Sequence, residues 1–177
     1  SVIVMKYFLI GTDEKNRNPY NINKNRALDT RKLTREGIDT LPRWNIISMD
    51  LPDEGFFPDL ICSPCILMSR DCIRAVTMYQ PDIIYKGVKL WESDSGVNRT
   101  YFLSIIEEQD CMSEKTQRSA MGNRIINLVL NEEKIGANAV FRIKGCDKSC
   151  IAARLDVVES LLRRGVQGIT IEEVQLV

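Results

Sequence analysis

The C-terminal stretch from Ser149 to Val177 constrains the fold of this chain more than any other segment. Its apolar side chains recur at the spacing of one helix face and lie at Leu155, Val158, Leu161 and Leu162. A basic pair and a glycine, residues 163–165, then stand where such a helix should end. The pattern predicts a helix over about 153–164 and a closing strand over 169–174, a scaffold segment without chemistry of its own.

A second helix is predicted over about 71–80. Ser69 has the character of an N-cap, Asp71 complements the helix dipole, and apolar residues follow at helical spacing until Pro81. Strand-like runs rich in β-branched and aromatic residues occupy 2–10, 44–49, 83–90, 100–106, 125–130 and 139–143. Runs of this kind around two helices predict an α+β fold with a mixed or antiparallel sheet.

The length of 177 residues favours one domain spanning 1–177. Residues 1–11 form its opening strand, 12–43 a long polar loop or arm, and 44–177 its main body. The arm alternates asparagines with basic residues, which suits neither a helix nor a strand. We expect a solvated loop ordered by packing of Tyr20, Ile22 and Leu28. The alternative is a contact arm, because long loops in compact domains are often functional.

Two segments of the chain echo one another. Cys65-Ile66 leads into a helix and then a strand beginning near Ile83, and Cys150-Ile151 leads into a helix and then a strand beginning near Ile169. The two segments could be duplicated strand–helix–strand units. A chance match of common α/β patterning is the favoured interpretation, and no repeat is predicted.

Composition removes several classes of function. The 24 basic and 24 acidic residues balance, which argues against a dedicated nucleic-acid or membrane-surface binder. No apolar run approaches the ~20 residues that span a bilayer, and residues 1–6 do not resemble a secretory signal. Histidine is absent, which removes the commonest general base and metal ligand. We therefore expect a cytoplasmic protein without membrane or nucleic-acid partners.

Four of the six cysteines are paired by spacing, Cys62 with Cys65 and Cys146 with Cys150. Together they could hold zinc, although structural zinc ligands usually lie on short knuckles. A redox role for Cys62 and Cys65 would require a lowered thiol pKa at a helix N-terminus. The favoured interpretation is reduced thiols, mostly buried as small apolar groups.

No catalytic signature, phosphate-binding glycine loop or nucleophile elbow occurs in the sequence. Glu107, Glu108 and Asp110 could ligate a hard cation, but a solvated acidic edge is the favoured interpretation. No catalytic residue, cofactor or metal is therefore assigned, and recognition of a partner at the surface is expected. A small α+β enzyme using Lys, Tyr or carboxylate groups is the alternative.

The order of several segments resembles a known family. The segments are Asp59-Leu60, Ile66 to Arg70, Tyr101 to Leu103 with Asp110, Val129-Leu130, Lys134-Ile135, Phe141 to Ile143 and Ile151 to Val174. In this order they look like a bacterial immunity-protein family of polymorphic toxin systems, formerly catalogued as a domain of unknown function. The resemblance covers roughly 44–174 and consists mostly of core positions.

This resemblance implies a non-catalytic cytoplasmic antitoxin that binds and neutralises a cognate toxin domain. It transfers no functional residues to this chain. Between 92 and 110 the chain carries four net negative charges, and many toxins that attack nucleic acid are basic. The expected toxin-contact surface is therefore acidic and comprises Trp91, Glu92, Asp94, Glu107, Glu108 and Asp110.

Overall fold

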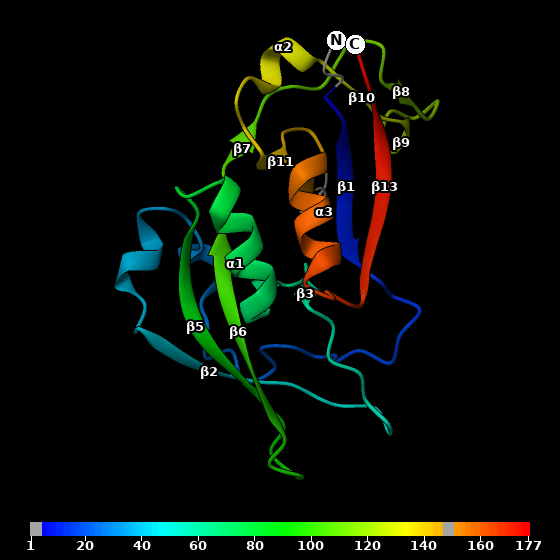
Figure 1. Cartoon of the computed structure of the whole chain (residues 1–177). Coiled ribbons are helices and arrows are strands. Elements are labelled where there is room, and N and C mark those ends of the chain that lie inside the picture. The colour runs from blue at the N-terminus through cyan, green and yellow to red at the C-terminus, as the bar shows by residue number, and fades with distance from the viewer. Residues whose placement is uncertain (1–4, 147–150) are drawn as a thin grey trace.

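The computed structural model describes residues 5–146 and 151–177, and these form a single-domain α+β fold (Figure 1). The helices are α1 (Arg70–Tyr79), the one-turn α2 (Glu132–Ile135) and α3 (Leu155–Arg163). The two predicted main helices are confirmed within two residues at each end. Ser69 caps α1 as expected, because its side chain accepts a hydrogen bond from the Cys72 backbone amide at 3.2 Å.

Two main sheets replace the one sheet that the sequence suggested. The first has the strand order β2-β5-β6-β4-β3. Its members are β2 (Trp44–Ser48), β3 (Leu60–Ile61), β4 (Leu67–Met68), β5 (Ile84–Trp91) and β6 (Asn98–Ile105).

The second sheet has the order β10-β13-β1-β12-β11-β7. It comprises β1 (Tyr7–Thr12), β7 (Glu108–Gln109), β10 (Val129–Leu130), β11 (Val140–Ile143), β12 (Ile151–Arg154) and β13 (Ile169–Leu176). A small additional ribbon pairs β8 (Gln117–Arg118) with β9 (Ile125–Asn127).

The two sheets repeat one arrangement. The first unit comprises β2 to β6 with α1. Its connection β4-α1-β5 places β4 on one side of β6 and β5 on the other, both antiparallel to β6. β3 is antiparallel to β4, and β2 is parallel to β5. In the second unit, β10 to β13 with α3 and β1, the connection β12-α3-β13 flanks antiparallel β1, with β11 antiparallel to β12 and β10 parallel to β13. The correspondence that the sequence showed at two segments thus extends, in the strand arrangement, to five strands and a helix.

The side-chain faces of the two units also correspond. Phe102 of β6 pairs with Met68 on one side and Gly87 on the other. Phe8 of β1 pairs with Ala153 and Glu173. Both phenylalanines are partly buried and pack on the same hydrophobic cluster. In each unit, therefore, the helix lies on the face that bears this phenylalanine.

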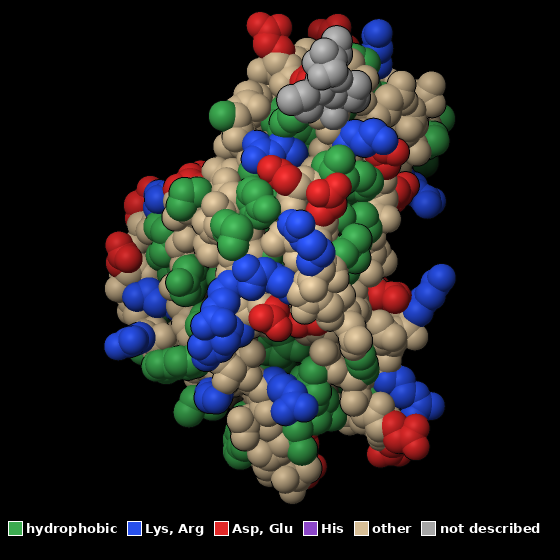
Figure 2. All heavy atoms as spheres, viewed as in Figure 1, with side chains coloured by type: hydrophobic (Ala, Val, Ile, Leu, Met, Phe, Trp, Pro, Cys, Tyr) green, Lys and Arg blue, Asp and Glu red, His purple; other side chains and the backbone are tan. Residues whose placement is uncertain are grey.

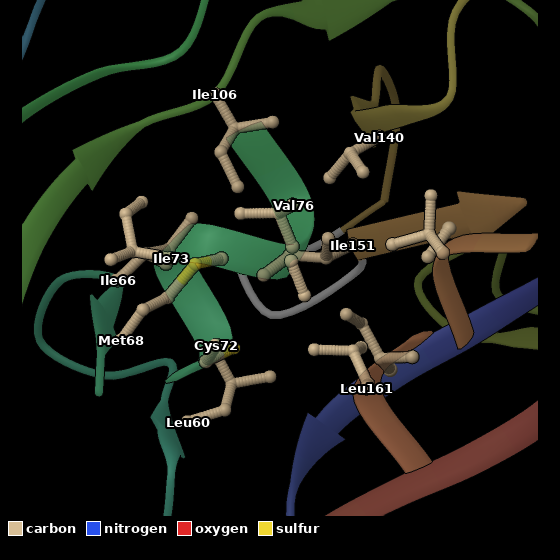
Figure 3. Close-up of a cluster of buried hydrophobic side chains, with 14 of the residues drawn as sticks. Leu60, Ile66, Met68, Cys72, Ile73, Val76, Ile106, Val140, Ile151 and Leu161 are labelled. Atoms are coloured by element: carbon tan, nitrogen blue, oxygen red, sulfur yellow. The ribbon is translucent and has the colours of Figure 1, made fainter. Parts of the chain in front are cut away.

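The two helices lie side by side and join the units through one core (Figures 1 and 3). Cys72, Ile73 and Val76 of α1 and Leu161 of α3 point into this core. Sheet residues enter it from both units, with Leu60 and Met68 from the first and Val140 and Ile151 from the second. Burial of these side chains couples the stability of the two units, because separating the units would expose apolar surface of both to water.

The arm covers the other face of the first sheet. It is irregular except for two short 3₁₀ turns, Thr30–Lys32 and Gly37–Thr40. Leu28 and Ile38 are buried, and Leu28, Ile22, Leu33 and Leu41 belong to the cluster beneath β5 and β6. Of the three residues expected to order the loop, Leu28 is buried and Ile22 is half-buried, but Tyr20 is 51 % exposed.

The asparagines of the arm replace secondary structure by local hydrogen bonds. Asn23 has a φ of 68°, donates to the Leu28 carbonyl at 2.8 Å and accepts from the Leu28 amide at 3.0 Å. Asn21, with a φ of 48°, donates to Asp50 at 2.8 Å. Asparagine tolerates this left-handed backbone better than other non-glycine residues, which explains why the segment is rich in it.

Several sequence expectations need correction. Residues 153 and 154 belong to β12, and α3 begins only at Leu155. Leu162 is 57 % exposed, and Val157 takes its place in the core. The expected strand 125–130 is divided into β9, which exposes Ile126, and the buried β10.

Candidate functional site

The acidic residues expected to form one contact surface lie in two groups. Trp91, Glu92 and Asp94 are at the tip of the β5–β6 hairpin, where Trp91 pairs with Asn98. Glu107, Glu108 and Asp110 follow the opposite end of β6, beyond the pair Ile84–Ile105. The hairpin is eight residues long on each strand, so roughly 25 Å separates the groups. The structure does not bring them together.

Each acidic group is engaged by its surroundings. Glu92 accepts hydrogen bonds from the backbone amides of Asp94 and Ser95 at 3.0 and 2.8 Å and from the Ser95 hydroxyl. These bonds, that of the Ser95 hydroxyl foremost, lower the pKa of Glu92. At the other end, Glu107 accepts from Arg35 at 2.6 Å, and Glu108 lies 3.8 Å from Arg142. Basic residues therefore offset part of the charge there.

The cysteines of the expected zinc set do not converge in the described part of the chain. Cys62 belongs to the core shared by the helices, Cys65 to the cluster beneath the arm and Cys146 to a third cluster. Cys150 lies outside the described residues. Among residues 5–146 and 151–177, no group of three or more metal-ligating side chains occurs. Burial raises the pKa of Cys65 to about 12 and also raises that of Cys62, which disfavours the reactive thiolate.

A cavity of about 130 Å³ lies beside these thiols. Residues from the arm, the 62–66 segment and the end of β6 line it, and they include Cys62, Cys65, Ser104 and Ile106. Arg142 is the one charged side chain among its described lining residues, and its Nε donates to the Ile106 carbonyl at 2.8 Å. A cavity of this size holds a few waters or one small molecule, and its described lining brings together no pair of acid–base groups.

The most distinctive surface is the uncovered part of the helix-bearing side of the first sheet. α1 packs on β4 and β6 and leaves β5 and β2 beside it open. Register places Trp44 and Ile46 of β2, Tyr85, Lys89 and Trp91 of β5, and Phe102 of β6 on this side. We call these six residues the aromatic face. Figure 2 shows hydrophobic side chains at the surface in this region, with basic side chains close by.

Exposure singles this face out. Trp44 is 46 % exposed, Ile46 64 %, Tyr85 47 % and Trp91 40 %. Four of the eleven exposed large hydrophobic side chains of the described chain therefore lie on one side of two adjacent strands, β2 and β5. Both tryptophans of the sequence are among them. Scattered exposed apolar residues are ordinary, but a contiguous group usually marks an interaction site.

The rings are held in a defined arrangement. Trp44 lies flat against Gly87, where an added Cβ would stand 2.5 Å from a ring carbon. The Trp44 and Phe102 ring centroids are 6.3 Å apart, and Tyr85 meets Phe102 edge-on at 5.7 Å. Contacts of this geometry are favourable beyond the area they bury. The aromatic face is therefore preorganised by the strand register and by Gly87, whose missing side chain leaves room for the Trp44 ring.

Two cations border the rings. The Lys89 ammonium lies 5.9 Å from the Trp44 ring centroid and donates to the Thr100 hydroxyl at 2.6 Å. The Arg70 guanidinium lies 5.8 Å from the Phe102 centroid. Neither cation has a carboxylate partner among the described residues. Positive charge is thus held over the aromatic rings without being neutralised.

Sequence reasoning identified Trp91 but missed the rest of this face. Trp44, Tyr85 and Phe102 lie on three strands, and only the pairing register shows that they share a side. A usable signal was present in β5, where Tyr85, Gly87, Lys89 and Trp91 alternate with Lys86, Val88 and Leu90. Two-residue alternation that places aromatic residues opposite a buried apolar row indicates an exposed aromatic stripe.

No protein-family model matches this sequence, and no curated protein matches it. None of the helices formed by the described residues is both long and apolar enough to cross a membrane.

Proposed function

We propose that this protein is a cytoplasmic, non-catalytic immunity protein that binds a cognate toxin domain and neutralises it. The observation that supports a binding role is the aromatic face, on which both tryptophans and a tyrosine are exposed, and Trp44 and Tyr85 are held by ring contacts with Phe102. Trp, Tyr and Arg are the residues that most often dominate the energetics of protein–protein interfaces. The step from partner binding to toxin neutralisation rests on the resemblance of residues 44–174 to the immunity-protein family.

The remaining features are compatible with this role. The sequence has no histidine, and the described lining of the cavity beside Cys62 offers a single charged group. A binder also benefits from a stiff scaffold, because a surface that is already ordered loses less conformational entropy on association. The buried cluster beneath the arm, which includes Ile47, Val88 and Leu90, provides such support behind the aromatic face.

Co-expression tests the proposal. The proposal predicts that a neighbouring gene encodes the toxin domain. This domain is induced in a bacterial host, alone or with this protein. Growth should be restored only when both are made, and the two purified proteins should elute as one complex with a 1:1 mass. An unrelated toxin domain serves as the control and should remain lethal. Loss of growth despite abundant folded antitoxin would refute the proposal.

A further inference from the structure

We propose that the aromatic face is the surface that docks the toxin, and that it accepts a segment presenting an apolar side chain flanked by carboxylates. This inference rests on the proposed function and specifies its contact chemistry. It differs from the acidic surface expected from the sequence, with which it shares only Trp91.

Equivalent positions in the two units carry different side chains. The row Met68-Phe102-Gly87 of the first unit continues to Trp44 on β2. The corresponding row of the second unit, Ala153-Phe8-Glu173, ends on β13 at an exposed carboxylate. Glu173 is the counterpart of Gly87, and no residue of β10 pairs with Glu173 in the place of Trp44. The shared strand arrangement therefore forms in the second unit without an aromatic residue there.

The two cations beside the rings, Arg70 and Lys89, have hydrogen-bond donors that no described residue uses. The guanidinium of Arg70 makes no hydrogen bond to any described residue, although it has five N–H donors. The ammonium of Lys89 uses one of its three donors, on Thr100. The six residues of the aromatic face and the side chains paired with them include no carboxylate. A carboxylate from outside the chain would complement both cations.

The charges around the aromatic face favour a protein partner over nucleic acid. Cations beside aromatic rings can also receive the bases and phosphates of single-stranded nucleic acid. The chain as a whole carries no net charge, and Glu92 and Asp94 lie in the turn at the tip of the same hairpin. A phosphate backbone carries a charge at every nucleotide and would be repelled by these carboxylates as it passed along β5. A protein segment needs carboxylates only beside Lys89 and Arg70. An acidic, apolar protein segment fits both the rings and the limited positive charge.

The experiment measures affinity for the adjacent-gene toxin domain by calorimetry, with matched variants. Ile46→Asp and Lys89→Glu alter the aromatic face, whereas Ile126→Asp and Lys115→Glu alter exposed residues of the same types elsewhere. Ile46 and Ile126 are 64 % and 67 % exposed, so neither substitution disturbs the core. Each change on the aromatic face should weaken binding at least about tenfold, and Trp44→Ala about thirtyfold or more. The control variants should bind within about twofold of the wild type.

Charge and salt dependence sharpen the test. The combined Glu107→Lys and Glu108→Lys variant should retain wild-type affinity, whereas Lys89→Glu should reduce the dependence of affinity on salt. Unfolding midpoints of all variants establish that they fold. Wild-type affinity in every aromatic-face variant would overturn the docking inference and leave the proposed function intact, whereas no binding by the wild type would overturn the proposed function itself.

A homodimer of the wild type that Ile46→Asp dissociates would assign the face to a second copy. A labelled single-stranded oligonucleotide that competes with the toxin domain would assign it to nucleic acid. Either result would overturn the inference.

Discussion

The first and second units share strand order, strand direction and helix placement, yet they differ at the sheet positions that their helices leave open. In the first unit, Gly87 provides a flat site on which Trp44 rests. In the second, Glu173 occupies the equivalent position and lies 3.8 Å from Lys6. The positions common to both units are those that bury apolar area against the helices. The positions that differ therefore reveal which side chains serve purposes other than folding.

The core that joins the two units should respond most strongly to substitution. Leu161 of α3 is fully buried there, and Leu161→Ala should lower the free energy of unfolding by about 2–5 kcal/mol. Its neighbour Leu162 is 57 % exposed, and Leu162→Ala should change the same quantity by less than about 0.5 kcal/mol. Urea unfolding followed by circular dichroism measures both. Equal effects would show that α3 does not bury the face described here.

Exchanging the residue that distinguishes the units should have the next largest effect. Gly87→Glu places a Cβ where the Trp44 ring lies, so the ring must move, at a cost of about 1–3 kcal/mol in unfolding free energy. The near-ultraviolet dichroism of tryptophan should change accordingly. Glu173→Ala in the second unit is the counterpart and should shift stability by less than about 0.5 kcal/mol. An unchanged tryptophan signal in Gly87→Glu would contradict the stacked geometry.

The helices begin differently in the two units, which gives a smaller effect. Ser69 caps α1 through a side-chain hydrogen bond, whereas Arg154 at the start of α3 makes no such bond. Ser69→Ala should cost about 1 kcal/mol of unfolding free energy, and Ser69→Gly only a few tenths. Thermal and urea unfolding of the two variants provide the measurement. If alanine and glycine have the same effect, the cap is not the source of the stability.

The start of α3 depends instead on a charge pair and should give the smallest effect. Arg154 donates two hydrogen bonds of 2.9 Å to Asp156, and these bonds lower the pKa of the Asp156 carboxyl below its ordinary value near 3.8. Because the folded state favours the ionised form, the contribution is complete above pH ~4 and is lost as the pH falls through the lowered pKa. Asp156→Asn should therefore lower stability at pH 7 by less than about 1 kcal/mol, since the pair is partly exposed. The difference from wild type should shrink at pH 2–3, as measured by urea unfolding at each pH.

The sequence predicted the local elements well where one signal dominated. Ser69, Asp71 and the apolar spacing up to Pro81 located α1, and β-branched runs located β2, β5, β6 and β11. β12 was missed because Ala152 and Ala153 favour helices by intrinsic propensity. In the folded protein these small residues suit a fully buried central strand between β1 and β11. Tertiary packing outweighed local preference there.

The division into two sheets and the position of the aromatic face depend on contacts distant in sequence. Nothing local to Tyr7 indicates that it pairs with both Arg154 and Val174. Likewise, the alternation in β5 shows that Tyr85 and Trp91 share a side but not that Trp44 joins them from β2. The acidic residues show the opposite case. They are close in sequence, between 92 and 110, but the length of the β5–β6 hairpin separates them in the fold.

The strand borrowed by the second unit affects how the chain must fold. β2 to β6 lie within one continuous stretch, so the first unit can assemble as soon as that stretch emerges from the ribosome. β1 precedes all of them in the chain, yet its partners β12 and β13 follow them. Contacts this remote slow folding, and Tyr7, Phe8 and Ile10 stay unpaired in the meantime. The apolar side chains of β1 therefore lack their partners while the residues between β1 and β12 are made, which exposes them to premature association.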